Sequence, residues 1–236
     1  MSEKVQGTSS EGSRSKSLKK AVIVRFVAAV LLLGLMFFLP AWTFNYWQAW
    51  VYILIILVSM SIMARYLYRH DPELLERRMR MKERQTTQKL IIALSFLFFL
   101  PAFIIPGFDV RFGWSNVPFI VVVIADVLVL FGYLMFALVL KTNSYASRII
   151  EVEKGQKVIT TGPYAIVRHP MYLASLILYA FSPLALGSYW AMIPVVLLII
   201  LLVARIKGEE KELLENLEGY KDYVVKTKYR LLPGIW

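Results

Sequence analysis

Long blocks of predominantly apolar residues constrain this chain more than any other feature of its sequence. Six blocks occur, at residues 21–40, 47–68, 88–106, 117–140, 171–187 and 189–206. An apolar stretch of about 18 or more residues is long enough to cross the hydrocarbon core of a bilayer as an α-helix. A transmembrane barrel would show short segments of alternating hydrophobicity instead. We therefore predict an all-α, polytopic membrane protein with about six transmembrane helices.

The last two apolar blocks follow each other almost without a break. The fifth block is short and contains Pro183, and the residues LGSYW at 186–190 turn the chain directly into the sixth block. A short loop between two helices makes them antiparallel neighbours. The sequence therefore predicts a C-terminal helical hairpin whose first helix is kinked or does not cross the membrane completely.

The distribution of basic residues predicts the orientation of these helices. The chain has 27 Lys and Arg against 16 Asp and Glu, a net charge of +11. With six spans, 26 of the 27 basic residues fall on one side, and only Arg111 falls on the other. Basic residues mark the cytoplasmic side, so both termini and the two long loops are expected there. The positive charge is then explained by anionic lipid headgroups rather than by nucleic acid.

Three regions are expected from the composition. Residues 1–20 are polar, Ser-rich and basic, which indicates a disordered cytoplasmic tail rather than a cleaved signal peptide. Residues 21–206 form the transmembrane domain, and residues 207–236 form cytoplasmic helices that complete the site. The chain has no cysteine, which excludes disulfides, thiol nucleophiles and thiolate metal sites. No metal is expected.

The basic loop after the second block is predicted to contain a short helix. Asp71 suits the position that caps a helix, and Pro72 suits its first residue. Acidic and basic residues four positions apart support a helix on the membrane surface. These pairs are Glu73–Arg77 and Glu76–Arg80. We expect a solvated connecting helix here.

One candidate for chemistry is the stretch TTGPYAIVRHPMYLAS at residues 160–175. Gly162-Pro163 predicts a turn, and Pro170 suits the first residue of the fifth helix. His169 then lies near the helix N-cap, where free N–H groups favour an anionic ligand. The alternative is that His169 only caps the helix.

A second candidate cluster lies where the sixth helix leaves the membrane. Arg205 and Glu209 are four residues apart and therefore share one helix face, with Glu210 next to them. The hairpin returns this face to the start of the fifth helix, so both clusters are expected to meet. In isolation Arg205 and Glu209 could simply form an ion pair at the interface.

Two further features allow either a functional or a structural interpretation. Asp126 lies in the middle of the fourth block, and an intramembrane carboxylate is a functional candidate unless it only bonds a neighbouring helix. Tyr220, Tyr223 and Val224 follow Gly219 at helical spacing. They indicate a small amphipathic helix that packs under the bundle.

The segments QKVITTGPYAIVRHPMY, RIKGEEKELL and GYKDYVVKTKYRLLPG together resemble the isoprenylcysteine carboxyl methyltransferase family. Members are integral membrane enzymes that transfer a methyl group from S-adenosylmethionine to a lipid-bearing carboxylate. The resemblance covers roughly the last 80 residues of the chain. Phospholipid N-methyltransferases and sterol reductases carry related segments.

The resemblance implies a role for individual residues. Arg205 would face the acceptor carboxylate, and Glu209 would contact the cofactor, so these two are the expected catalytic residues. The other residues expected to line the cofactor pocket are Gln156, Lys157, Val158, Ile159, Tyr164, His169, Pro170, Met171 and Tyr172.

The residue chemistry agrees with methyl transfer to a carboxylate. Glu209 and the faces of Tyr164 and Tyr172 could stabilise the positively charged sulfonium of S-adenosylmethionine. A carboxylate is ionised at neutral pH and needs no general base, and Arg205 can hold it with two hydrogen bonds. The acceptor is expected to be a lipid or prenyl-linked molecule that enters from the bilayer, while the cofactor enters from the cytoplasm.

Three other functions are alternatives to methyl transfer to a carboxylate. A phospholipid amine is protonated at neutral pH and would need a base such as Glu210 or Asp126, and Arg205 would repel it. A nicotinamide-dependent reductase would be expected to have more spans and a separate dinucleotide fold. In a non-catalytic membrane scaffold or transporter, whose basic loops bind lipid, changes at His169, Arg205 or Glu209 would affect nothing but stability.

Overall fold

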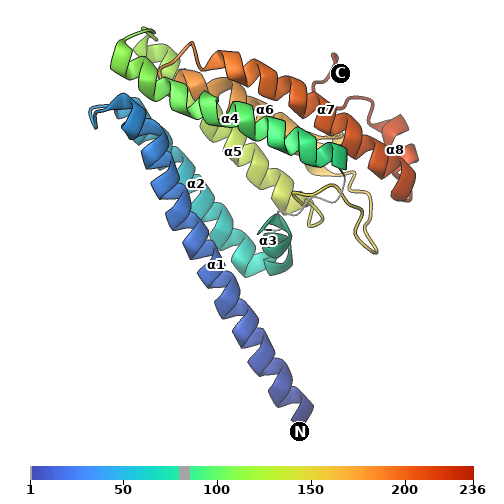
Figure 1. The fold of residues 1–236 in the computed structure, drawn as a ribbon. Coiled ribbons are helices and arrows are strands. Elements are labelled where there is room, and N and C mark those ends of the chain that lie inside the picture. The colour runs from blue at the N-terminus through green and yellow to red at the C-terminus, as the bar shows by residue number, and fades with distance from the viewer. Residues whose placement is uncertain (1, 80–85) are drawn as a thin grey trace.

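The computed structural model describes residues 2–79 and 86–236, and in this part of the chain every regular element is helical. Four long helices, α1, α2, α4 and α5, are followed by the α6–α7 hairpin and three short helices complete the fold (Figure 1). The bounds are α1 Ser2–Ala41, α2 Trp47–His70, α3 Pro72–Met79, α4 Thr86–Phe112, α5 Phe119–Thr142, η1 Gly162–Ala165, α6 Pro170–Ala185, α7 Met192–Asn216 and α8 Tyr220–Lys226. The predicted all-α class is confirmed.

Four helices are long and apolar enough to cross a membrane: Ser17–Ala41 within α1, then α2, α4 and α5. The two remaining apolar blocks form α6 and α7, as predicted, but differ from full spans in length or charge. With 16 residues, α6 is about 24 Å long, shorter than a hydrocarbon core of about 30 Å. In α7, an apolar first half continues into the charged sequence RIKGEEKELLEN.

The helices α4, α5, α6 and α7 pack as one group (Figure 1). Beside this group, α1 lies against α4 and α2 lies against α5. Gly132 allows the close contact between α5 and α6, because a Cβ atom there would lie 2.9 Å from Leu178 Cδ2. The core of the bundle is rich in aromatic rings, and Phe37, Tyr52 and Phe103 contact one another within it.

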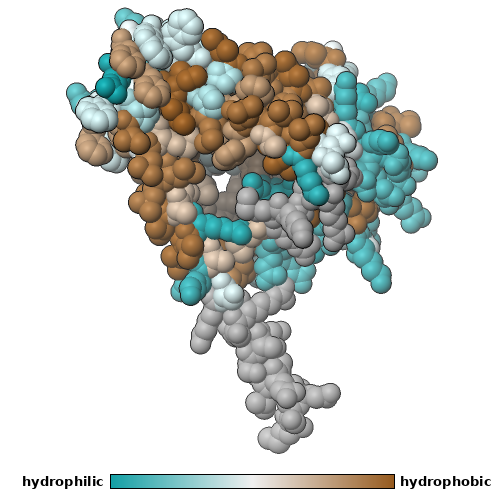
Figure 2. Space-filling view, viewed as in Figure 1, coloured by the Kyte–Doolittle hydropathy of each residue, from teal (hydrophilic) through white to brown (hydrophobic). Residues whose placement is uncertain are grey.

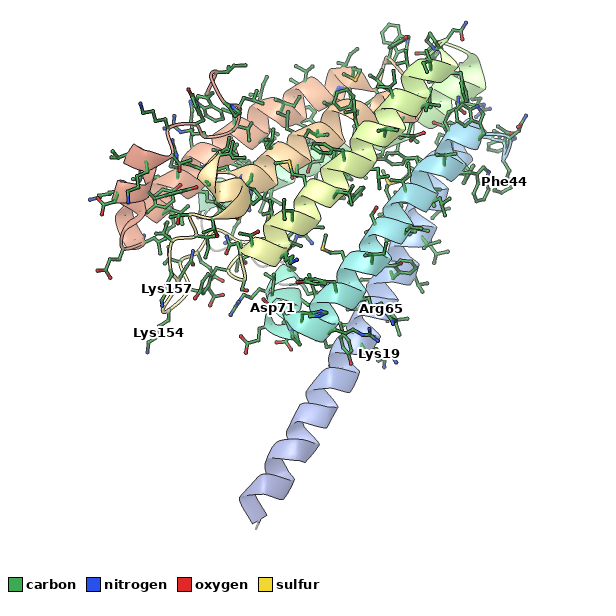
Figure 3. All side chains as sticks on the ribbon, turned by 180° about the vertical axis from the view of Figure 1, so that it is seen from behind. Lys19, Phe44, Arg65, Asp71, Lys154 and Lys157 are labelled. Atoms are coloured by element: carbon green, nitrogen blue, oxygen red, sulfur yellow. The ribbon has the colours of Figure 1, made fainter. Side chains whose placement is uncertain are left out.

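The two ends of the bundle differ in composition. One end, called the site end from here on, is formed by α3, the 143–161 loop and α8. The opposite end, called the far end, is formed by the turns 42–46, 113–118 and 186–191. Figure 3 shows Lys19, Arg65, Asp71, Lys154 and Lys157 at the site end and Phe44 at the far end. Exposed aromatic side chains gather at the far end, namely Trp42, Phe44, Trp50, Trp114, Tyr189 and Trp190. Such rings are typical of a membrane–water interface.

Hydrophobic side chains cover the outside of the bundle between these ends. Figure 2 shows brown, hydrophobic residues over the helices and teal, hydrophilic residues where α7 and α8 end. Exposed examples on three different helices are Leu35, Leu54 and Leu134, which are 59%, 61% and 61% exposed. A surface of this kind faces lipid rather than water.

The predicted cap of α3 is confirmed, because Leu74 N donates to Asp71 Oδ1 at 2.9 Å and the helix begins at Pro72. Arg77 and Glu73 form the predicted pair at 3.4 Å. The second predicted pair, Glu76–Arg80, lies outside the described residues.

Residues 2–20 differ from the sequence-based expectation. The composition predicts a disordered tail, whereas α1 begins at Ser2 and continues into the first span. The first proline in this helix is Pro40, and Lys, Glu and Ser are compatible with helix once a following segment has nucleated it.

Candidate active site

The stretch from Thr160 to Ser175 folds as its turn signals predict. Gly162 adopts φ +57°, a left-handed conformation that suits glycine, and opens η1. Pro170 is the first residue of α6, and His169 is its N-cap. The His169 side chain makes no capping hydrogen bond, so capping does not account for its imidazole.

Two backbone hydrogen bonds attach this stretch to the C-terminal segment. Arg168 N donates to Tyr229 O and His169 N donates to Arg230 O, each at 2.9 Å. The buried Arg168 guanidinium adds bonds to the carbonyl oxygens of Thr227 at 2.8 Å and Lys228 at 2.6 Å. The C-terminal residues therefore hold the start of α6 in place, a role that sequence reasoning did not assign to Arg168.

Glu210 belongs to the same structural network. Its Oε1 accepts from Arg168 Nε at 2.6 Å, and its Oε2 accepts from Arg230 Nε. Burial alone would raise the pKa of the Glu210 carboxyl, but hydrogen bonds from Arg230 and Arg168 outweigh it and lower the pKa below its ordinary value. Glu210 therefore stays ionised and paired, which is unsuitable for a general base.

Tyr172 and Glu209 join α6 to α7, as the predicted hairpin requires. The Tyr172 hydroxyl donates to Glu209 Oε2 at 2.5 Å. This contact brings together the two clusters that lie 37 positions apart in the sequence. The centroids of the Tyr172 and His169 rings also lie 5.8 Å apart. The side chains of His169, Tyr172 and Glu209 are therefore neighbours.

A cavity of about 790 Å³ opens beside these residues. Every residue that the sequence predicts for the site lines it: Gln156, Lys157, Val158, Ile159, Tyr164, His169, Pro170, Met171, Tyr172, Arg205 and Glu209. A volume of this size is typical of sites for small molecules and cofactors. The structure therefore brings the predicted residues together around one space.

The cavity has two halves of different chemistry. The polar half is formed by the 143–159 loop, η1 and the end of α7 with α8. The apolar half lies between the helices and is lined by Ile92, Phe96, Phe99, Tyr133, Phe136, Leu178, Tyr179, Leu198, Leu201 and Leu202. Arg205 lies one helical turn beyond Leu201 and Leu202 and thus stands where the apolar half ends.

The buried polar atoms on the cavity wall that lack a hydrogen-bond partner among the described residues include Nε2 of His169 and the hydroxyl of Tyr220. Burial lowers the pKa of His169 below its ordinary value, so its imidazole is neutral at neutral pH. Glu210 Oε1 lies 4.0 Å from that nitrogen, beyond hydrogen-bond length. Buried polar groups normally have partners, so these two atoms fit a polar ligand in the cavity.

The loop residues of the polar half are held by local bonds. Gln156 Oε1 accepts from Glu153 N at 2.9 Å and closes a turn around Gly155. Lys157 is exposed at the rim (Figure 3). The Tyr164 hydroxyl accepts from Asn143 Nδ2 at 2.8 Å, and Tyr164 O accepts from the Tyr223 hydroxyl at 2.7 Å. Tyr223 thus packs under the bundle as predicted and also fixes Tyr164.

Sequence reasoning missed Gln88, which positions Arg205. Gln88 is 2% exposed, and its Oε1 accepts from Arg205 Nη1 at 3.3 Å, while Arg205 Nη2 donates to Arg148 O at 2.7 Å. Gln88 reaches Arg205 across Gly208, where a Cβ atom would lie 2.0 Å from Gln88 Nε2. The only signal in the sequence is a glycine inside a helix next to charged residues.

Asp126 lies away from this site. It is 7% exposed on α5, its Oδ1 has no hydrogen-bond partner within residues 2–79 and 86–236, and it is not one of the cavity-lining residues. Over the same residues no group of three or more His, Cys, Asp or Glu side chains is placed to hold a metal ion.

The apolar helices and the cavity at their charged end are typical of one class: integral membrane proteins with a cavity of small-molecule size at one end of the helix bundle. Residues 122–215 match the isoprenylcysteine carboxyl methyltransferase (ICMT) family. This match bears out, for these residues, the resemblance to a methyltransferase family that the sequence shows. The match begins inside α5, includes α6, Arg205 and Glu209, and excludes α3, Gln88 and the C-terminal segment. No curated protein matches the chain.

Proposed function

We propose that this protein transfers a methyl group from S-adenosylmethionine to a carboxylate on a lipid or prenyl-linked acceptor. The observation that carries this proposal is the two-part cavity, whose polar and apolar halves meet at Tyr172, Arg205 and Glu209. One half is suited to a polar cofactor and the other to an aliphatic chain, and the reacting groups would meet between them.

The polar half fits S-adenosylmethionine. When bound, this cofactor supplies an electrophilic methyl group on a positively charged sulfur. The Glu209 carboxylate and the rings of Tyr164 and Tyr172 would stabilise that charge. His169 Nε2 and the Tyr220 hydroxyl, which lack partners in the described protein, would hydrogen-bond its polar groups.

Arg205 would hold the acceptor carboxylate. Its guanidinium is already oriented by Gln88 and by the carbonyl of Arg148, and a pre-oriented donor loses little entropy when it binds. A carboxylate needs no base, so catalysis would consist of alignment and exclusion of water. The carboxylate oxygen would approach the methyl carbon in line with the carbon–sulfur bond. The new carbon–oxygen bond would form as the carbon–sulfur bond breaks, which gives a methyl ester and S-adenosylhomocysteine.

The positions of Glu210 and Asp126 favour a carboxylate acceptor over a phospholipid amine. An amine would require a base to remove its proton. Glu210 is paired with Arg168 and Arg230, and Asp126 lies away from the cavity. Neither of the two bases considered from the sequence is therefore placed for this task.

The charge distribution supports a cytoplasmic site. If the six apolar blocks all cross the membrane, 26 of the 27 basic residues fall on the side of the site, which under the positive-inside rule would face the cytoplasm together with both termini. S-adenosylmethionine would then enter from the cytoplasm, and the acceptor would enter between the helices from the bilayer.

The test is binding of labelled S-adenosylmethionine to the purified full chain, followed by transfer to a prenylcysteine analogue or to phosphatidylethanolamine. We expect cofactor binding and transfer to the carboxylate only. Glu209→Ala should lose cofactor affinity, while the control Glu215→Ala, on the exposed face of α7, should keep it. Absence of binding to the wild type at high micromolar cofactor would refute the proposal.

A further inference from the structure

Arg78, the residue before the last of α3, reaches into the wall of the cavity. Its Nη1 lies 3.3 Å from Met171 Sδ and 3.5 Å from Ser147 O. Its Cζ atom stands 5.1 Å from the centre of the Phe136 ring. The guanidinium therefore contacts the first turn of α6 and the aromatic wall of α5.

Among the residues that the structure describes, Arg78 differs from Arg77 and Arg168 in having no anionic partner. Arg168 is paired with Glu210 and Arg77 is paired with Glu73 and Glu153. Within the described part of the chain, no Asp or Glu lies at ion-pair distance from Arg78. Both of its polar contacts are weak, one long and one to sulfur. Burial and the nearby Arg148 lower the pKa of Arg78 to about 10, so it is still charged at neutral pH.

A charged group on a cavity wall without a counterion indicates an anionic ligand, because burying an unpaired charge is costly. The position of Arg78 shows which part of the cavity that ligand would occupy. Phe136 belongs to the apolar half, and its ring lies directly beneath the guanidinium. Arg205 stands at the same boundary from α7, and Tyr172 lies near both arginines.

We propose that Arg78 and Arg205 together bind the anionic end of the acceptor, from two walls of the cavity. This inference rests on the proposed function, which supplies an acceptor with an aliphatic chain and a carboxylate. If the aliphatic chain of the acceptor lies between the helices, its carboxylate would lie where the apolar half of the cavity ends, between the two guanidinium groups. Each carboxylate oxygen has two lone pairs, so an oxygen that accepts one N–H can still attack the methyl group.

The S-adenosylmethionine carboxylate is the competing ligand for Arg78. The position above Phe136 favours the acceptor, because a ligand there adjoins the apolar half rather than the 143–159 loop. This makes two different predictions for one variant: loss of acceptor affinity if Arg78 binds the acceptor, or loss of cofactor affinity if it binds the cofactor.

The test measures both affinities separately on the full chain in nanodiscs. A prenylcysteine carboxylate and its carboxamide serve as acceptor probes without cofactor, and labelled S-adenosylmethionine is titrated without acceptor. We expect Arg78→Met to weaken carboxylate binding by about tenfold or more, to leave carboxamide binding within about twofold, and to leave cofactor binding within about twofold. Arg78→Lys should restore part of the loss.

Arg77→Met is the matched control, because it removes the same charge from the adjacent residue, which does not line the cavity. It should change neither affinity by more than about twofold. Equal weakening for carboxylate and carboxamide, loss of cofactor affinity alone, or unchanged affinities in Arg78→Met would each overturn the inference. Failure of the wild type to bind S-adenosylmethionine would refute the methyl transfer but not an Arg78-dependent preference for the carboxylate.

Discussion

The far end and the site end of the bundle differ in how completely their buried polar groups are hydrogen-bonded. At the far end, Asp109 is 1% exposed and accepts from Ser115 N at 2.6 Å, Ser115 Oγ at 2.6 Å and Ser188 Oγ at 2.5 Å. At the site end, His169 Nε2 and the Tyr220 hydroxyl have no hydrogen-bond partner among the described residues. A closed network stabilises a fold, whereas incomplete bonding on a cavity wall indicates a place for a ligand.

The same distinction separates two adjacent residues of α7. Glu210 is held by Arg168 and Arg230 and fixes the C-terminal segment. Glu209 turns the other way, lines the cavity and accepts from Tyr172. The sequence alone does not distinguish the two carboxylates. Their hydrogen-bond partners do: those of Glu210 indicate a structural role, and those of Glu209 place it in the candidate site.

The largest expected effect is at the site end. Arg205→Met should lower kcat/KM for the carboxylate acceptor by about a hundredfold or more, because the carboxylate loses its pre-oriented donor. The melting temperature in detergent should change little, since the aliphatic stem of methionine retains much of the packing. Rates with a prenylcysteine analogue check this prediction. Activity within a factor of three of wild type would contradict the role of Arg205.

The converse effect is expected at the far end. Asp109→Ala leaves the buried hydroxyl of Ser188 and the N–H of Ser115 without their acceptor, at a cost of about 3 kcal/mol. Thermal unfolding in detergent should therefore shift clearly downward, while the folded fraction should bind S-adenosylmethionine with wild-type affinity. Loss of cofactor affinity in folded Asp109→Ala would show that the two ends are not independent.

Gly208 offers a smaller and more selective change. In Gly208→Ala, the new Cβ would overlap Gln88 Nε2, so the Gln88 side chain must move away from Arg205. We expect kcat/KM to fall by about tenfold with little loss of stability, since alanine favours the helix. Gly34→Ala is the control, because a Cβ there meets nothing within 4 Å. Equal activities of the two variants would remove Gln88 from the positioning of Arg205.

How much of this could be predicted from the sequence differs between local and long-range features. Gly162, Pro170 and Asp71 act on their own neighbours, and the turn, helix start and cap they predict are all present. The hairpin is also local in sequence, so the meeting of Tyr172 and Glu209 could be expected from loop length. The resemblance supplied the remaining predicted residues of the cavity wall, but not Arg78 or the apolar half.

Contacts between distant segments could not be predicted in this way. Gln88 lies 117 positions from Arg205, and Arg78 lies 93 positions from Met171. Neither contact can be predicted from the periodicity or the charge pattern of the sequence. The short fifth helix, in contrast, is a local feature: the sequence predicts a helix that is kinked or does not cross completely, and α6 has 16 residues with Pro183 inside it.

The smallest expected effect concerns pH and His169, whose pKa burial lowers below its ordinary value of 6.5. The unfolded chain therefore binds a proton at a higher pH than the folded protein does, and stability must fall as the pH decreases through about 6.5 and below. His169→Asn lacks this group and should show a flatter dependence of the melting temperature between about pH 7 and pH 5. Because Glu210 titrates only at lower pH, it contributes little to this window. An unchanged slope in His169→Asn would mean that the imidazole is not kept neutral by burial.

Bound S-adenosylmethionine should alter the slope in wild type, because a ligand on Nε2 changes the proton affinity of the imidazole. The same ligand should leave the slope of His169→Asn unchanged. The comparison tests whether the Nε2 nitrogen contacts the ligand.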